Sequence, residues 1–305
     1  MSPLLKIAYT PIYAHPLPKD HRFPMLKYEL IPAQLLHEGT ITVANLFAPA
    51  RCKLKHILWT HDSAYVDKLL HQSLTVREQR HIGFPQSPML TERELVIAQG
   101  TIDCCGFAQD AGVALNVAGG THHAFRDRGE GFCMLNDIAV AANYLLQTGQ
   151  AKKIIVIDLD VHQGNGTAKI FENEPRVFTF SMHGEHNYPF RKGQSDLDIP
   201  LPDGTGDTDY LDLLKANLPP LLQSIQPDRA FYLSGVDILS TDRYGKLNVS
   251  MQGCSERDAL VFKLLQQHQI PCTVSMGGGY SADIKIIIEA HCNTFRIAKE
   301  VYGLS

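Results

Sequence analysis

The sequence predicts an α/β protein in which helices cover both faces of an open, mainly parallel β-sheet. Short apolar runs alternate with longer amphipathic runs along all 305 residues. Because the short runs are apolar at nearly every position, they indicate strands buried on both faces, which are typical of parallel sheets. No internal repeat, low-complexity tract or linker interrupts this alternation, so we predict one domain over residues 1–305.

Seven short runs have the length and composition of buried strands. In chain order they are KIAYT (6–10), HILWT (56–60), ALNVAGG (114–120), KKIIVIDLD (152–160), VFTFSMH (177–183), RAFYLSG (229–235) and PCTVSMGGG (271–279). Seven longer runs have helical patterns, and they cover residues 25–37, 63–73, 91–111, 135–148, 209–225, 255–268 and 284–302. In the fourth of these, Leu135, Ile138, Ala139 and Leu145 fall on one side of a helix.

The composition is that of an ordinary globular protein. Hydrophobic residues make up 44% of the chain and charged residues 20%, with a formal net charge of -4 and no block of Lys or Arg. Nucleic acid is therefore not expected as a partner. No apolar run reaches the roughly 20 residues of a membrane span, and the N-terminus lacks the pattern of a signal peptide. We expect no membrane contact and a cytoplasmic location.

The chain has seven cysteines, an odd number, and no CxxC pair. This pattern predicts neither a disulfide framework nor a Cys-rich zinc site. We expect most of the cysteines to be small buried side chains in a reducing compartment.

Polar residues with reactive or metal-binding side chains gather near the ends of predicted strands. They occur at 119–123, 158–165, 181–183, 237 and 277–280. In open parallel α/β sheets, the loops that follow the carboxyl ends of the strands open on one edge, and ligands bind there. These five segments are therefore expected to meet at one site.

The segment VIDLDVHQGNG, residues 156–166, carries Asp158, Asp160 and His162 at alternate positions. Alternate residues of a strand point to the same face, and two carboxylates so close together require a positive partner. A cation bound by Asp160 and His162, with Asp237 as a third ligand, would supply it. Two carboxylates and one imidazole are typical of catalytic zinc sites, although Fe(II) or Co(II) would also suit them. Alternatively, Asp158 or Asp160 could cap a turn and His162 could pack in the core. This structural role would account for any one of these residues, but not for several buried carboxylates on the same face.

Two further segments supply candidate catalytic groups. GGTHHAF contains His122 and His123, which titrate in the range needed for a general base and a general acid. Asp158 and Asn165 are the available partners for their second ring nitrogens. In MGGGYS, the Tyr280 hydroxyl could donate a hydrogen bond to a developing oxyanion, although a core aromatic next to a flexible turn is the alternative. That segment lacks the glycine patterns of nucleotide-binding loops.

Together, these segments resemble the zinc-dependent histone deacetylase family of the arginase/deacetylase fold group. They are GGTHHAFRDRGEGFCMLND, VIDLDVHQGNG, FSMH, SGVDILSTDRYGKLN and GGGYS, in the order typical of the family. The resemblance runs from about Ile7 to Tyr302. The segments DRGEGFC, DLDVHQGNG and GVDILSTDRYG are most similar to the class IV branch and to bacterial histone-deacetylase-like amidohydrolases. The resemblance implies the arginase/deacetylase fold and one catalytic domain over residues 1–305.

The resemblance also implies two bound metals. One zinc ion per chain would be held by Asp160, His162 and Asp237, with Fe(II) as an alternative. A monovalent cation, usually potassium, would have a structural role. The positions that match its site are Asp158, Asp160, His162, Ser181 and Met182.

The catalytic roles are likewise implied by the resemblance. His123 takes the place of the principal general base and then acid, and His122, paired with Asp158, assists electrostatically. Tyr280 would polarise the acyl carbonyl together with the zinc. Asn165 stands where class I enzymes have Asp, so the partner of His123 becomes a neutral amide and the pKa of His123 should be lower. The positions expected to contact the substrate are Gly131, Phe132, Tyr188 and Gly278.

The implied activity is hydrolysis of the amide of N-ε-acyl-lysine, with an acetyl or longer acyl group, in proteins or peptides. A small-molecule amidohydrolase, such as an acetylpolyamine deacetylase, has the same core and is the alternative. An arginase-type enzyme needs a second metal, which Asn165 and the lack of a DxD pair around Asp237 disfavour. A non-catalytic acyl-lysine binder is also disfavoured, since every expected catalytic residue is present. Before residue 40 we expect a loop at the pocket rim. Arg22 or Lys27 in this loop could contact substrate, but we favour solvated side chains for both.

Overall fold

A single parallel β-sheet lies at the centre of the molecule. The computed structural model describes residues 3–305. Within that range, eight strands pair in the order β2-β1-β3-β8-β7-β4-β5-β6, and every neighbouring pair is parallel. The strands are β1 (Lys6–Ala8), β2 (Leu46–Phe47), β3 (Val113–Asn116), β4 (Ile154–Asp158), β5 (Val177–Gly184), β6 (Leu197–Leu201), β7 (Arg229–Leu233) and β8 (Cys272–Ser275). The predicted α/β class with a mainly parallel sheet is confirmed.

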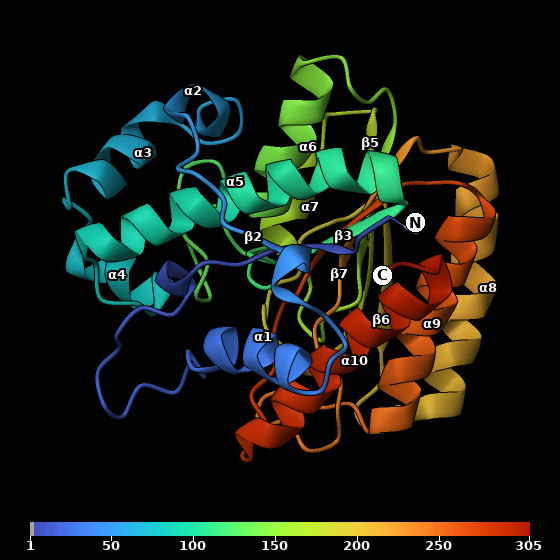
Figure 1. Ribbon diagram of the computed structural model, residues 1–305. Helices are drawn as coiled ribbons and strands as arrows, with labels where there is room; N and C mark the ends of the chain where they lie inside the picture. The colour runs from blue at the N-terminus through green and yellow to red at the C-terminus, as the bar shows by residue number, and fades with distance from the viewer. Residues whose placement is uncertain (1–2) are drawn as a thin grey trace.

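Helices cover both faces of this sheet (Figure 1). They are α1 (Lys27–His37), α2 (Leu54–Ile57), α3 (Ser63–Leu70), α4 (Val76–Ile82), α5 (Pro88–Ala111), α6 (Asp137–Gln147), α7 (Asn165–Phe171), α8 (Asp207–Ile225), α9 (Met251–Gln267) and α10 (Ile284–Tyr302). The long helix α5 packs on β1, β3 and β8 with α6 beside it, whereas α1, α9 and α10 form the opposite layer with α8 at its outer end. This double cover explains why β3, β4 and β8 are buried at every position.

Local signals set the helix boundaries. Helix α5 begins after Ser87, whose side-chain oxygen accepts a hydrogen bond from the Leu90 N–H at 3.1 Å, and Pro88 takes its first position. Helix α9 begins in the same way at Ser250, which accepts from the Gly253 N–H. The seven predicted helices are confirmed, with boundaries shifted by at most a few residues.

The prediction of a strand at 56–60 is wrong. The segment instead contains the end of α2 and a turn. Ile57 is fully buried, but the adjacent Leu58 is 44% exposed, which fits a short helix that buries one side. A five-residue apolar run does not distinguish a strand from a buried helical turn, because both bury a few apolar side chains.

Besides the misread α2, the sequence patterns missed two short strands and two short helices. Strand β2 has two residues, and β6 contains Pro200, which is tolerated there because β6 is an edge strand. Helices α4 and α7 have seven residues each, so an apolar repeat is hardly visible in them. The missed strands lie at the two edges of the sheet, where burial is incomplete and the apolar signal weakens.

One hydrophobic cluster includes buried residues from Leu5 to Leu304, and the two ends of the described chain meet. The Leu5 N–H donates to the Ser305 carbonyl at 3.1 Å. All seven cysteines are buried and free, as expected. None of the helices within residues 3–305 is long and apolar enough to cross a membrane.

Candidate metal centre and active site

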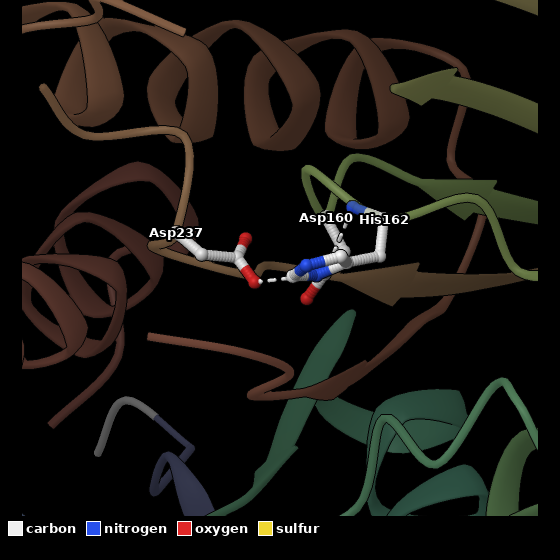
Figure 2. A group of neighbouring side chains, drawn as sticks. All are labelled: Asp160, His162 and Asp237. Carbon is white, nitrogen blue, oxygen red and sulfur yellow. Dashed lines mark hydrogen bonds and ion pairs between the residues drawn. The ribbon is translucent and has the colours of Figure 1, made fainter. Parts of the chain in front are cut away.

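Three potential metal ligands converge at the carboxyl edge of the sheet. Asp160 and His162 follow β4, and Asp237 follows the neighbouring strand β7. Their ligand atoms all lie within 4.8 Å of one another. His162 Nδ1 is 3.0 Å from Asp160 Oδ1 and 3.1 Å from Asp237 Oδ2, and the side chains point toward one another (Figure 2). The structure therefore brings together the three residues predicted to bind zinc.

The electrostatics of this group require a positive charge. Asp160 and Asp237 are both buried. Burial, together with the negative charge of Asp160, raises the pKa of Asp237 to about 7. For His162, burial opposes the charged form, but hydrogen bonds to the two carboxylates prevail and raise its pKa to about 10. Two buried carboxylates that face one imidazole nitrogen form a donor set that fits a divalent cation.

Backbone groups hold the two carboxylates in place. The Val161 N–H donates to Asp237 Oδ1 at 2.9 Å, and the Gly278 N–H donates to Asp160 Oδ2 at 2.7 Å. A Cβ on Gly278 would lie 1.9 Å from Asp237 Oδ2, so no larger residue fits at this position. Gly278, predicted to contact substrate, lines the cavity and also orients a metal ligand.

The two adjacent histidines have different partners. His122 Nδ1 is 2.7 Å from Asp158 Oδ2, and His123 Nδ1 is 2.7 Å from Asn165 Oδ1. Because a carboxylate or an amide oxygen can only accept, Nδ1 carries a proton in both rings. His122 Nε2 lies 4.0 Å from Asp160 Oδ1, so this nitrogen is turned toward the metal centre.

These partners shift the two pKa values in opposite directions. For His122, burial lowers the pKa, but the charge and hydrogen bond of Asp158 outweigh burial, and the net pKa is raised. For His123, burial and the positive charges of His122 and His162 lower the pKa well below its usual value, and the hydrogen bond to Asn165 offsets this only in part. At neutral pH, His123 is therefore the neutral imidazole that a general base must be.

Tyr280 lies at the end of the glycine segment that follows β8. Its N–H donates to Asp242 Oδ2 at 2.6 Å, and its ring packs against Phe23 and Tyr244. Burial, reinforced by the charge of Asp237, raises the pKa of Tyr280 well above its usual value. The hydroxyl thus keeps its proton and remains a hydrogen-bond donor beside the metal centre.

A cavity of about 650 Å³ leads to this group of residues. Gly131, Phe132 and Tyr188, predicted to contact substrate, line it together with His122, His123 and Tyr280. A Cβ on Gly131 would lie 2.7 Å from His123 Cδ2, so glycine leaves the space beside that imidazole open. The following residue, Phe132, has a φ of 67°, which is rare for a bulky side chain, and its N–H donates to the Ile82 carbonyl at 2.6 Å.

The residues predicted to bind potassium lie at the end of β4, just after it, and on the adjacent strand β5. Asp158 pairs in register with Ser181 of the adjacent strand β5, and Met182 follows, fully buried. The Ser181 hydroxyl is 2.9 Å from His183 Nδ1, and Asp158 Oδ1 accepts from the Asp160 N–H. The structure places Asp158 and Ser181 opposite each other on adjacent strands, and the potassium ion itself remains a prediction.

The expectation of a solvated Lys27 is wrong. Its side chain is 1% exposed, and its ammonium group donates to the Gly277 carbonyl at 2.9 Å. Burial, partly offset by the charges of Asp237 and Asp160, lowers its pKa to about 8. Lys27 lies in an amphipathic helix, where a lysine is ordinarily placed on the solvent side, so the sequence held no signal for this burial.

Two other supporting residues were missed. Asp242 accepts from the N–H groups of Tyr244, Gly245 and Tyr280 and so shapes the turn beside Tyr280. Arg257 is fully buried in α9 and donates to the Leu159 carbonyl at 3.3 Å, just before the metal ligand Asp160. The adjacent Asp258 pairs with Arg257 at 2.9 Å. An adjacent Arg and Asp within a helical pattern gave no indication of this role.

Comparisons with known proteins agree with this geometry. A model of the histone deacetylase domain matches residues 21–295. An uncharacterized protein of Picosynechococcus is 42% identical over 97% of this chain and 99% of its own length. Histone deacetylase clr6 of Schizosaccharomyces pombe is 30% identical over 88% of this chain and 68% of its length. A crystal structure of an HDAC homolog complexed with SAHA superposes with a TM-score of 0.84, at 26% identity, and covers 99% of this chain and 85% of that one.

The family match and the fold lead to the same conclusion. The matched range includes every residue of the candidate metal centre and both histidine pairs. The family has the arginase/deacetylase fold, and a catalytic metal is one of its properties. The chain belongs to the histone deacetylase family and is a hydrolase of its deacylating kind.

Proposed function

We propose that this protein hydrolyses the amide bond of N-ε-acyl-lysine in proteins or peptides, through one catalytic domain that spans residues 1–305. One zinc ion would be held by Asp160, His162 and Asp237. The observation that carries the proposal is the meeting of this triad with His123 and Tyr280 in one cavity. The aromatic walls at Phe132 and Tyr188 suit the aliphatic side chain of lysine.

The side chains of the protein can carry the proton transfers of amide hydrolysis. When bound, zinc would polarise the acyl carbonyl and lower the pKa of a water molecule. Neutral His123 would accept the proton of the attacking water at Nε2 and later deliver it to the departing amine. Tyr280 would donate a hydrogen bond to the oxyanion, and His122, held by Asp158, would contribute positive charge.

The second cation has a separate role in this proposal. Asp158 and Ser181 would contact potassium, which would partly neutralise the carboxylates behind the catalytic metal. That arrangement leaves Asp158 free to hold His122 through its other oxygen. We assign the ion a structural function and not a step in hydrolysis.

A panel of substrates tests the proposed activity. Acetyl-lysine and longer acyl-lysine peptides should be hydrolysed, whereas acetylated polyamines should be poor substrates. Chelation should abolish turnover, and about one equivalent of zinc per chain should restore it; Fe(II) tested in parallel identifies the better metal. Failure to hydrolyse any acyl-lysine peptide in the metal-loaded state would refute the proposal. Efficient hydrolysis of acetylpolyamines alone would favour the small-molecule alternative.

Asn165→Asp should shift the acidic limb of the pH profile of kcat/KM to higher pH. A carboxylate at the place of the Asn165 amide oxygen, 2.7 Å from His123 Nδ1, would stabilise the imidazolium and raise the pKa of His123. His123 acts as a base only in its neutral form. If its pKa is higher, His123 becomes protonated at a higher pH as the solution is acidified, and activity is lost there.

The matched control for this variant is Asn173→Asp. Residue 173 is exposed and lines a neighbouring surface pocket with Asn165, so the substitution adds the same charge without touching His123. Its acidic limb should coincide with that of the wild type. An unshifted limb in Asn165→Asp would exclude His123 as the group that titrates there.

A further inference from the structure

The lining of the catalytic cavity contains more cationic side chains than carboxylates. Its lining includes Arg22, Arg93 and Lys246, whereas the single carboxylate in that lining is the metal ligand Asp160, within the described residues 3–305. Arg93 is buried and paired with Glu94. Lys246 lies 3.7 Å from Asp203. Arg22 is the cation whose charge remains uncompensated.

Arg22 is exposed and held by aromatic rings. Its guanidinium carbon lies 5.0 Å from the centroid of the Phe132 ring and 5.5 Å from that of Tyr244. In the part of the chain that the structure describes, Arg22 makes neither an ion pair nor a hydrogen bond. Stacking occupies the faces of a guanidinium and leaves its in-plane N–H donors free, so these donors are available to a ligand.

Two carboxylates elsewhere around the cavity are already engaged. Glu130 lies 2.8 Å from Arg128 and accepts from the Tyr188 hydroxyl at 3.0 Å. Asp242 accepts backbone N–H groups through both of its oxygens. Since both have partners, the free donors of Arg22 have the greatest affinity for a carboxylate brought by the substrate.

We propose that Arg22 is a specificity-determining residue that binds a carboxylate of the substrate beside the acyl-lysine. Phe132 lines the cavity that the acyl-lysine enters, so a cation stacked on that ring faces the groups next to the modified residue. The preferred substrate class is an acyl-lysine flanked by an acidic residue, or one with a free α-carboxylate. Polycationic substrates are disfavoured. This assignment rests on the proposed function.

Peptides that differ in one charge test the role of Arg22. Three blocked peptides carry Glu, Gln or Lys next to the acyl-lysine, and a fourth ends in acyl-lysine with a free carboxylate. Wild-type kcat/KM should be at least about fivefold higher for the Glu peptide than for the Gln peptide, and lowest for the Lys peptide. The preference should shrink as salt is added. Comparison of kcat/KM for the fourth peptide and for its C-terminal amide shows whether Arg22 binds an α-carboxylate as well as it binds a Glu side chain.

Substitutions then assign the preference to this side chain. Arg22→Gln should bring the Glu to Gln ratio close to one, and Arg22→Glu should reverse the preference toward the Lys peptide. The control is Lys152→Gln, which removes one exposed positive charge before β4, at the opposite edge of the sheet, and should leave the ratio unchanged. Equal ratios in wild type and Arg22→Gln would overturn the assignment.

Measurements of peptide binding distinguish a failure of this inference from a failure of the proposed function. The dissociation constants of the same peptides can be measured on a His123→Ala protein with and without Arg22→Gln. If wild type hydrolyses none of the peptides, the proposed function fails, but the binding ratio still decides whether Arg22 selects a carboxylate. If all are hydrolysed at equal rates and bound equally well, the deacylase stands and the role of Arg22 falls.

Discussion

Asp237→Ala is expected to lose both the bound metal and the hydrolysis of acyl-lysine. Asp237 supplies one of three ligands whose donor atoms lie within 4.8 Å, and it is fully buried. Metal affinity should fall at least about a hundredfold, beyond the usual loss for a residue that only orients a ligand. Metal content after dialysis and competition with a chromophoric chelator measure the affinity.

A second variant distinguishes the role of Asp237 as a metal ligand from its role as a hydrogen-bond acceptor. Asp237 Oδ1 accepts the Val161 N–H, and Asp237→Asn retains an oxygen for that bond while it removes the charge. Asp237→Asn should therefore melt close to the wild type yet bind the metal poorly. Asp212→Ala on the exposed side of α8 is the control and should keep full metal content. Normal metal binding by Asp237→Asn would refute the assigned site.

His123→Ala should retain the metal but turn over at least about a hundred times more slowly, on the scale of general acid–base catalysis. His123 Nδ1 is held by Asn165, and His123 is not one of the three candidate ligands. The loss should therefore appear in kcat, while metal content stays near one per chain. Steady-state kinetics and metal analysis on the same preparation test both statements.

His37→Ala is the control for this substitution. His37 is exposed at the end of α1, and its removal should leave kcat unchanged. Near-normal turnover by His123→Ala would remove this residue from the mechanism. A loss of metal equal to that of Asp237→Ala would instead place His123 in the metal site.

The sequence contained most of the site because its residues lie in a few short segments. Asp158, Asp160 and His162 are close in the chain, and the rule that parallel strands share a carboxyl edge was enough to bring Asp237 beside them. The same rule predicted that His122 and His123 lie near Tyr280. Buried parallel strands were readable because burial on both faces makes nearly every position apolar. Segment 56–60 was misread since a run of five apolar residues fits two structures.

The sequence by itself determined the α/β class, the parallel sheet and the identity of the candidate ligands and bases. Only the tertiary structure decided the burial of Lys27 against Gly277, the left-handed conformation of Phe132 and the place of Arg22 over two aromatic rings. The physical reason is that these features depend on contacts between segments distant in the chain. Local periodicity records which face of an element is buried, but not which distant group that face meets.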